Sequence, residues 1–595
     1  MITSEIKLIN NRPILFVDGK KTPAAAYITY FDERSHCADF ANAGYELYSL
    51  CASFTSLPLN ANTGFSPLFG IFDVKGKPDF SEFDKNVRQI VAACPTAKIF
   101  PRVRISMPQW WVDEHPDECC RSGDGRLREA IFSEEFKTTG AEMLREYIAH
   151  VQNSDYADNI VGYQVAGGFT EEWFHFDSKG SVSPNSKKYF NKYLQAHYPE
   201  KYHDEIEIPE EKTYTGKGFI EDEKALHYLE FLNVSLAETI GHFAHVVKEC
   251  VDFKQIVGAF FGYVVDIGGP VRGASGLWEM LKCPDVDFLC SPNSYAFMRA
   301  LGKDWHEPIP GETLKLHGKL YFAENDIRTH LSDYPGNCRP GVDPEKKYEG
   351  PIWKGPDTVE GSVAAVRKSF ARQLTHSNAF WWFDMWGGWY DCPELMSEMK
   401  SFCQIMGSYT NETTHLPKEN SDVVLVIDET YHRRIGTTDP MYYVAGKYRI
   451  ALGNTGIPYD IMMVEDFEHC KDYKAVILPY PEEYFSDTAK SLKDFCEKRN
   501  VPVLTATLSD MTDLDTDALR TRLIKSGVHC YCDSGDIIYR GNGYLCIHSA
   551  TAGKKTITLP HIAEITPITP TSTSFTSDNI EVEMKEFETL LFKVN

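Results

Sequence analysis

Carboxylate side chains follow two apolar runs of the sequence that are typical of buried strands. The stretch VAGGFTEEWF, residues 165–174, places Glu171 and Glu172 side by side, and Glu324 closes the second run in YFAENDIRTH. Hydrolysis of a glycosidic bond uses a pair of carboxyl groups, one protonated and one charged. With retention of configuration, one protonates the leaving oxygen and the other attacks the anomeric carbon from about 5–5.5 Å away. These glutamates therefore predict glycoside hydrolysis, if the fold brings them together.

The two carboxyl groups need different protonation states near neutral pH, and their surroundings must supply the difference. Trp173 and nearby aromatic side chains would desolvate one glutamate of the first pair and keep it protonated. Tyr295 and Arg328 would hydrogen-bond or pair with Glu324 and keep it charged. A Glu-Glu pair after a strand is by itself more often a solvated helix start. The functional interpretation therefore depends on both carboxylate sites together.

Other polar and aromatic residues fall near the ends of predicted strands and would bind substrate. Arg104 would bind a sugar hydroxyl or neutralise nearby acids. Asp384 would orient another site residue or cap the following helix. Trp382 is the tryptophan that we expect to stack on a sugar face, because it lies near the end of the last strand. The predicted substrate-binding residues are Arg104, Asn293, Tyr295, Arg328, Trp382 and Asp384.

Eight short apolar runs, separated by segments of helical period, predict parallel strands joined by helices. The runs cover residues 24–31, 45–53, 97–106, 159–168, 255–264, 286–295, 319–328 and 378–388. This pattern is typical of a (β/α)8 TIM barrel, in which the active site lies at the carboxyl ends of the strands. Strands four and seven face each other across the barrel mouth, so their glutamates would converge on one bond.

The α/β architecture is expected to consist of four parts. Residues 1–22 alternate polar and apolar side chains around two turn signals and predict a β-hairpin. The catalytic barrel would occupy residues 23–415. Residues 416–520 predict a smaller α/β domain of the doubly wound, flavodoxin-like type. Residues 521–595 are threonine-rich with a period of two, which predicts a small C-terminal β domain.

The charge of the chain argues against two classes of partner. Lysine and arginine number 61 and aspartate and glutamate 85, a net charge of -24. Such a field repels nucleic acid and anionic membrane. The first residues lack a signal-peptide pattern, and no apolar run approaches the roughly 20 residues of a membrane span. We therefore expect a cytoplasmic protein that acts on a glycoside or oligosaccharide and binds neither nucleic acid nor membrane.

The sixteen cysteines are scattered without a repeating framework, which favours reduced thiols over disulfides. Cys119, Cys120 and Cys392 would be the ligands of a structural zinc if they met in space, but isolated thiols are the more common outcome. The histidines show no metal-ligand spacing. We therefore predict no metal and no cofactor.

The order of these parts resembles glycoside hydrolase family 42, the β-galactosidases of clan A. The stretch RISMPQWWVDEHPDE, residues 104–118, is similar to the family's segment after strand three. The resemblance extends over nearly the whole chain and implies a retaining exo-β-glycosidase. It also implies a homotrimer held together by the domain at 416–520. That domain resembles glutamine amidotransferases, but it lacks the Gly-x-Cys-x-Gly nucleophile elbow after AVILPY.

One motif departs from the family pattern. The family ends strand four with Asn-Glu and then an aromatic residue, and that glutamate is the acid/base. Matching the aromatic residue to Trp173 places the acid/base at Glu172. Matching by distance from the strand places Gly167 and Gly168 at the two positions instead. We expect Glu172 to be the acid/base and keep Glu171 as the alternative.

The second carboxylate matches the family more closely, because Glu324 stands at the position of the nucleophile. The changed first motif leaves the sugar open, since its asparagine contacts the 2-hydroxyl. β-Galactosidase is the leading expectation, with β-mannosidase or another β-glycosidase of the clan as the alternative. A barrel that binds carbohydrate without turnover is a further alternative, and a metal-dependent hydrolase is the weakest one.

Overall fold

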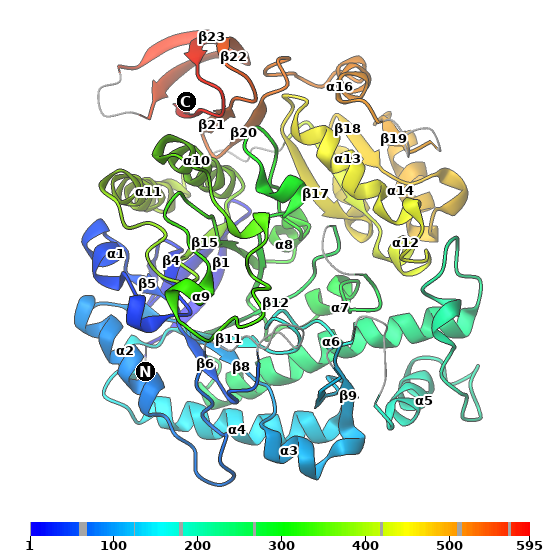
Figure 1. Cartoon of the computed structure of the whole chain (residues 1–595). Helices are drawn as coiled ribbons and strands as arrows, with labels where there is room; N and C mark the ends of the chain where they lie inside the picture. The colour runs from blue at the N-terminus through cyan, green and yellow to red at the C-terminus, as the bar shows by residue number, and fades with distance from the viewer. Residues whose placement is uncertain are drawn as a thin grey trace.

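The computed structural model describes residues 2–58, 68–123, 125–177, 183–265, 269–416, 421–507, 514–568 and 573–595. A closed barrel of parallel strands lies at the centre, with helices around it and two further domains at one side (Figure 1). The predicted TIM barrel followed by an α/β domain and a β domain is confirmed.

Each of the eight predicted apolar runs contributes one strand of the barrel. In chain order the strands are β4 (Ala25–Ile28), β5 with β6 (Leu47–Tyr48 and Cys51–Ser53), β7 with β8 (Lys98–Ile99 and Arg102–Arg104), β11 (Gly162–Ala166), β12 (Ile256–Phe260), β13 (Phe288–Pro292), β14 (Leu320–Asn325) and β15 (Ala379–Phe383). Barrel strands two and three are each broken in two. β5 pairs with β7, β6 pairs with β8, and β15 pairs with β4, so the sheet closes on itself.

Helices cover the outside of the barrel and bury the outer faces of its strands. The longer ones are α2 (Ser81–Ala93), α4 (Glu134–Gln152), α6 (Glu223–Cys250), α10 (Val359–Thr375) and α11 (Pro393–Glu412). Asp222 caps the start of helix α6, and its carboxylate accepts hydrogen bonds from two backbone amides of the first turn. The helix packs with α5 (Ser186–His197) around a separate aromatic core in the long insertion between strands four and five.

The N-terminal hairpin, β1 (Ser4–Ile9) with β2 (Arg12–Val17), lies against the amino ends of barrel strands four and five. The Ser4 hydroxyl donates to the Val161 carbonyl and accepts from the Ile256 amide. At the turn of the hairpin, Arg12 Nε donates to Asn542 Oδ1 at 2.7 Å. The hairpin therefore joins the base of the barrel to the C-terminal domain.

The second domain is a four-stranded parallel sheet with helices on both sides. Its strands β16 (Val423–Ile427), β17 (Tyr459–Met463), β18 (Ala475–Leu478) and β19 (Val503–Thr505) lie in the order β17-β16-β18-β19. The helices α12 (Glu429–Arg433), α13 (Val444–Gly453), α14 (Asp487–Glu497) and α16 (Thr516–Lys525) connect or follow them. Arg449 of α13 donates to His306 Nδ1 of the barrel at 3.0 Å, so this domain is docked on the barrel.

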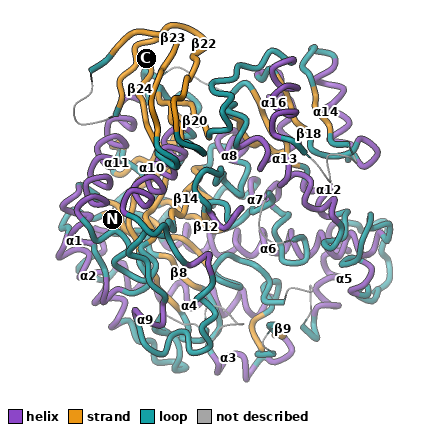
Figure 2. Tube along the Cα trace, turned by 45° about the horizontal axis from the view of Figure 1, so that its top comes forward, coloured by secondary structure: helices purple, strands orange, loops and turns teal. Residues whose placement is uncertain are grey.

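The C-terminal domain is a five-stranded antiparallel sheet that packs on α10 (Figure 2). Its strands β20 (Ile537–Gly541), β21 (Tyr544–His548), β22 (Gly553–Pro567), β23 (Phe575–Met584) and β24 (Thr589–Val594) lie in the order β20-β21-β24-β22-β23. Tyr539 of this sheet and Tyr459 of the second domain both donate to the Asp304 carboxylate of the barrel. One buried acid therefore ties the three domains together.

In the described part of the chain, no helix combines the length and apolar character that a membrane crossing needs.

Candidate active site

The glutamates of barrel strands four and seven meet around one buried arginine. Arg102, on β8, donates from Nη2 to Glu324 Oε2 at 2.8 Å, and its Nη1 lies 3.5 Å from Glu171 Oε2. Glu324 is part of β14, and Glu171 lies in the loop after β11. Arg102 is 1% exposed, so this group lies inside the barrel. Arg102 therefore lies between a glutamate of the strand-four loop and a glutamate of strand seven. The strand-four glutamate in this contact is Glu171, whereas the expected acid/base is Glu172.

Neighbouring side chains hold this group in position. Tyr30, after strand one, donates its hydroxyl to Glu171 Oε2 at 2.8 Å. Trp381 of β15 donates its indole Nε1 to Glu324 Oε2 at 3.3 Å. Burial alone would lower the pKa of Arg102, but the charges around it, Glu324 foremost, raise that pKa well above its usual value. The arginine is therefore a fixed positive charge beside both acids.

The loop that carries Glu171 and Glu172 has an unusual backbone. Thr170, Glu171 and Trp173 all have left-handed conformations, with φ of 58°, 70° and 56°. Such φ values are uncommon for residues other than glycine, and they are found where the surrounding structure enforces them, often at functional sites. The loop turns back on strand four, and the Trp173 amide donates to the Gly167 carbonyl at 2.8 Å. Glu171 is thereby directed into the barrel.

Two glycines make this turn possible. A Cβ atom built on Gly167 would lie 2.8 Å from the Trp173 ring, and one built on Gly168 would lie 2.6 Å from the Phe174 carbonyl oxygen. Both distances are too short for real contacts. The two positions directly after strand four therefore carry no side chain, and the carboxyl groups come from the returning loop, where Glu172 forms a backbone bridge with Gly167.

Glu172 is half-buried and has an environment that favours its protonated form. Burial raises the pKa of Glu172 to about 7, and the negative charge of Asp326 contributes in the same direction. The hydroxyls of Thr170 and Tyr263 oppose that rise. A carboxyl group with this pKa retains a proton near neutral pH, as a general acid must.

Glu324 also has a raised pKa, for a related reason. Burial raises the pKa of Glu324 to about 8, and Arg102 opposes this while the charges of Asp326 and Glu172 add to it. Since the charge of Glu172 raises the pKa of Glu324, the two groups titrate as a pair. Arg102 contacts Glu324 directly and opposes the rise of its pKa, but Glu324 still has the higher pKa of the two, so the pair loses its first proton mainly from Glu172.

Tyr295 and Arg328 lie elsewhere than the sequence suggested. Both contact Asp326, two residues beyond Glu324: the Tyr295 hydroxyl donates to its Oδ2 at 2.6 Å, and Arg328 Nη1 donates to the same oxygen at 2.7 Å. Among the residues that the structure describes, Nε and Nη2 of Arg328 find no hydrogen-bond partner. Its guanidinium lies over the ring of Trp353, 4.7 Å from the centroid. Arg328 thus keeps two donors that a substrate could use.

Arg104 binds the loop after strand two. Its Nη1 donates to the Leu57 carbonyl at 2.9 Å and its Nη2 to the Pro58 carbonyl at 3.0 Å. Burial and the nearby charge of Arg128 lower the pKa of Arg104 to about 10. The arginine that contacts the glutamates is Arg102, two residues earlier, which sequence reasoning missed. The period of two in a strand would have suggested it, because residues 102 and 104 lie on the same face.

Asn293 and Trp382 point away from the barrel interior, toward the surrounding helices. Asn293 Nδ2 donates to Asn325 Oδ1 at 2.9 Å and to the Ser369 hydroxyl of α10 at 3.0 Å. Trp382 is fully buried, and its ring stacks on Phe402 of α11 with centroids 5.8 Å apart. It offers no face to a sugar, because successive residues of a strand face opposite sides and Trp381 takes the inward position.

Asp384 organises the loop after strand eight. Its carboxylate accepts hydrogen bonds from the amides of Gly388 at 2.9 Å and Trp389 at 2.8 Å, and from the Tyr27 hydroxyl at 2.9 Å. Burial raises the pKa of Asp384, whereas these three donors favour its charged form. Asp384 therefore fixes the tryptophan-bearing loop at the barrel mouth.

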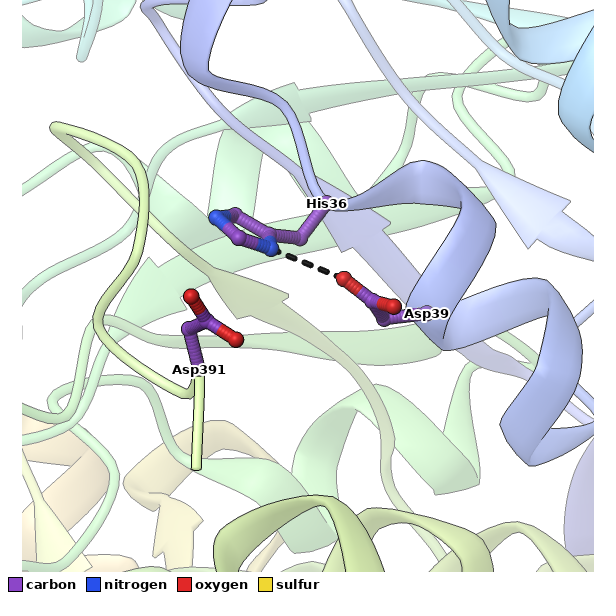
Figure 3. A group of neighbouring side chains, drawn as sticks. All are labelled: His36, Asp39 and Asp391. Carbon is purple, nitrogen blue, oxygen red and sulfur yellow. Dashed lines mark hydrogen bonds and ion pairs between the residues drawn. The ribbon is translucent and has the colours of Figure 1, made fainter. Parts of the chain in front are cut away.

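Within the part of the chain that the structure describes, one group of side chains could hold a metal ion. His36, Asp39 and Asp391 each offer one ligand atom, and these atoms lie within 4.8 Å of one another (Figure 3). His36 Nδ1 is 2.8 Å from Asp39 Oδ2. Asp39 and Asp391 are exposed, and such acidic groups are common without an ion. His36 and Asp39 lie at the start of α1 (Cys37–Ala43), and Asp391 lies in the loop after strand eight, outside the glutamate cluster.

Comparison with known proteins shows likeness of structure only. No protein-family model matches the sequence, and no curated protein matches it either. A β-galactosidase from Rahnella sp. R3 is 10% identical with a TM-score of 0.63, covering 96% of this chain and 98% of its own. A glycoside hydrolase family 42 β-galactosidase from G. stearothermophilus is 10% identical with a TM-score of 0.61, covering 100% and 99%.

A family 42 exo-carrageenase from Bacteroides ovatus is 11% identical with a TM-score of 0.55, covering 99% of this chain and 85% of its own. At these identities the likeness establishes the fold. The expected resemblance to family 42 β-galactosidases thus holds for the barrel and for both domains that follow it.

Proposed function

We propose that this chain is a retaining exo-β-glycosidase that removes terminal β-linked sugars, with β-galactosidase as the first candidate. The observation that carries the proposal is that carboxyl groups from the strand-four loop and from strand seven lie close together inside the barrel. Glu171 and Glu324 flank Arg102, and the charge of Glu172 acts on Glu324. The family 42 β-galactosidases of the same fold support this choice of chemistry.

In the first step, Glu172 donates its proton to the leaving oxygen while Glu324 attacks the anomeric carbon. The hydrogen bonds from Arg102 and Trp381 both fall on Glu324 Oε2, so Oε1 is the oxygen that attacks. The glycosidic bond breaks as the bond to Oε1 forms. In the second step, the carboxylate of Glu172 takes a proton from water, and that water releases the sugar from Glu324.

Glu171 acts as a positioning residue in this scheme. It is fully buried, and its Oε2 already accepts a hydrogen bond from Tyr30 and lies near Arg102. Glu172 is more exposed, and its pKa suits an acid. We therefore assign the acid/base to Glu172, with Glu171 as the alternative.

A screen of aryl β-glycosides with the wild type and three variants tests this proposal. Glu324→Gln should abolish turnover on any active substrate, and wild-type turnover by that variant would overturn the nucleophile assignment. Glu172→Gln should lose activity toward substrates with poor leaving groups, and azide should restore turnover by replacing the water that Glu172 activates. If azide rescues Glu171→Gln instead, the acid/base assignment is reversed.

The same screen identifies the sugar that the enzyme prefers. β-Galactosides are expected to react fastest, and a preference for β-mannosides or another epimer would select the alternative β-glycosidase. A carbohydrate-binding protein without turnover is a second candidate, favoured by the glycines that directly follow strand four. Calorimetric sugar binding without hydrolysis of any aryl glycoside would select it.

We also propose that the protein is a cytoplasmic homotrimer. Light scattering would measure the mass of the oligomer.

A further inference from the structure

A cavity of about 200 Å³ lies between the end of barrel strand five and the second domain. Tyr263, Val265 and Ser275 line it from the barrel side. His432, Tyr442 and Tyr443 line it from the second domain. The volume is below the roughly 300–1,000 Å³ of sites for drug-sized ligands, so the cavity suits a single ring.

The cavity adjoins the loop that carries the proposed acid. The rings of Tyr263 and Phe174 meet edge to face with centroids 5.5 Å apart. The His175 amide donates to the Arg272 carbonyl at 3.1 Å, and the Arg272 guanidinium lies 5.0 Å from the centroid of Phe169. The loops after strands four and five are therefore packed together, and Tyr263 belongs both to this contact and to the cavity wall.

The charge of the wall disfavours a cationic occupant. The described lining residues include two cations, Lys447 and Arg449, and no carboxylate, and Arg449 is bonded to His306 of the barrel. Burial lowers the pKa of His432 to about 4, so its ring is neutral at physiological pH. Aromatic and hydroxyl groups then remain as the main recognition elements, which suits a sugar or another uncharged ring.

Tyr443 stands out at this cavity because it is 58% exposed. It ends the short helix η7 (Pro440–Tyr443), and its ring meets that of Tyr442 edge to face with centroids 5.1 Å apart. A large aromatic ring left in solvent beside a cavity provides a surface on which a flat ring can stack.

We propose that this cavity is the subsite for the leaving group, and that Tyr443 stacks on a neutral sugar or aryl ring bound there. The inference rests on the proposed function, because the leaving oxygen lies where Glu172 delivers its proton. Tyr263 connects the Glu172 loop to the cavity, so a leaving group on that side extends toward the second domain. The second domain of the same chain then helps to select which glycosides are cleaved.

The test compares substrates that share one sugar and differ in the leaving group. A disaccharide and a phenyl β-glycoside fill the subsite, whereas the matching β-glycosyl fluoride leaves it empty. Tyr443→Ala should lower kcat/KM about tenfold for the first two substrates and leave the fluoride within about twofold. Tyr443→Phe keeps the ring and should retain most of the wild-type activity on all three.

Phe575→Ala is the matched control, because Phe575 is an exposed aromatic residue of the C-terminal domain. It should change none of the three reactions.

A separate readout is inhibition by the free monosaccharide of the leaving group, whose inhibition constant should rise about tenfold in Tyr443→Ala. Equal effects of Tyr443→Ala on the fluoride and the disaccharide, or no effect on either, would overturn the subsite. If the wild type hydrolyses none of the three substrates, both the glycosidase proposal and the subsite proposal are wrong.

Discussion

Arg102 donates a 2.8 Å hydrogen bond to Glu324 from the opposite part of the barrel wall, and almost none of the arginine is exposed. Glu171, on the other side of the guanidinium, supplies a second carboxylate. Removing a partner from a buried ionic group leaves an uncompensated charge, which costs more than the pair itself contributes. Both the fold and the proposed chemistry therefore depend on this arginine.

Replacement of Arg102 by methionine should reduce stability and activity together. We expect a loss of about 3–5 kcal/mol in the free energy of unfolding, because Glu171 and Glu324 lose their shared cation. We also expect a loss of about 10²–10³-fold in kcat, since the fixed charge next to the nucleophile is gone. Urea denaturation and steady-state kinetics measure the two effects. Arg102→Lys is the control, and full activity in Arg102→Met would contradict the role assigned to this residue.

The pH dependence of kcat/KM should be bell-shaped, with its maximum between about 7 and about 8. Glu172 has a pKa of about 7 and Glu324 a pKa of about 8, and the pair is productive when it holds one proton and that proton lies on Glu172. Below this window both groups are protonated and the nucleophile is lost. Above it both are charged and the acid is lost. Rates measured from about pH 5 to about pH 10 test this, and a maximum near pH 5 would contradict it.

Addition of one methyl group at Gly167 should disturb the strand-four loop. The new Cβ would lie 2.8 Å from the buried Trp173 ring, so Gly167→Ala should lose roughly 1–3 kcal/mol of stability and much of the activity. Gly407→Ala is the matched control, because that glycine lies in α11 with no atom within 4 Å of a built Cβ. Thermal unfolding distinguishes the two variants. Equal melting temperatures would show that the loop tolerates the added methyl group.

Metal removal should leave catalysis unchanged. The proposed reaction uses two carboxyl groups and no metal ion, and the His36, Asp39 and Asp391 group lies outside the glutamate cluster. Dialysis against a chelator and the variant His36→Ala should each keep kcat within about twofold of the wild type. Elemental analysis of the purified protein accompanies the assay. A tenfold loss that added zinc or manganese restores would give this group a functional role.

The apolar runs of the sequence predicted the barrel because parallel strands buried on both faces need such runs, whatever their neighbours. It was harder to predict which side of its strand each side chain faces. Trp381 and Trp382 are adjacent and equally apolar, and only the pleat of β15 decides which one reaches Glu324. Arg102 and Arg104 share a face, but their different depths in the barrel give them different partners.

The conformation of the strand-four loop could not be read from the sequence at all. Its left-handed residues, Thr170, Glu171 and Trp173, are not types that favour this backbone, so no local signal in the sequence predicts it. Tertiary contacts hold the turn, among them the stacking of Trp173 on Phe243 and its hydrogen bond to the Val165 carbonyl. The sequence identified the two glutamates as candidates, and the turn decides which one is buried and which one keeps access to substrate.

The bond between Arg12 and Asn542 has a consequence for how the protein is made. Its partners are 530 positions apart, one in the first hairpin and the other in the last domain. At a synthesis rate of about 5–20 residues per second, the ribosome reaches Asn542 roughly 25–110 s after Arg12. Asn542 also bonds to the carbonyls of Leu374 and Thr375, at the end of α10. The hairpin and the end of α10 therefore gain their shared link only after the last domain has been synthesised.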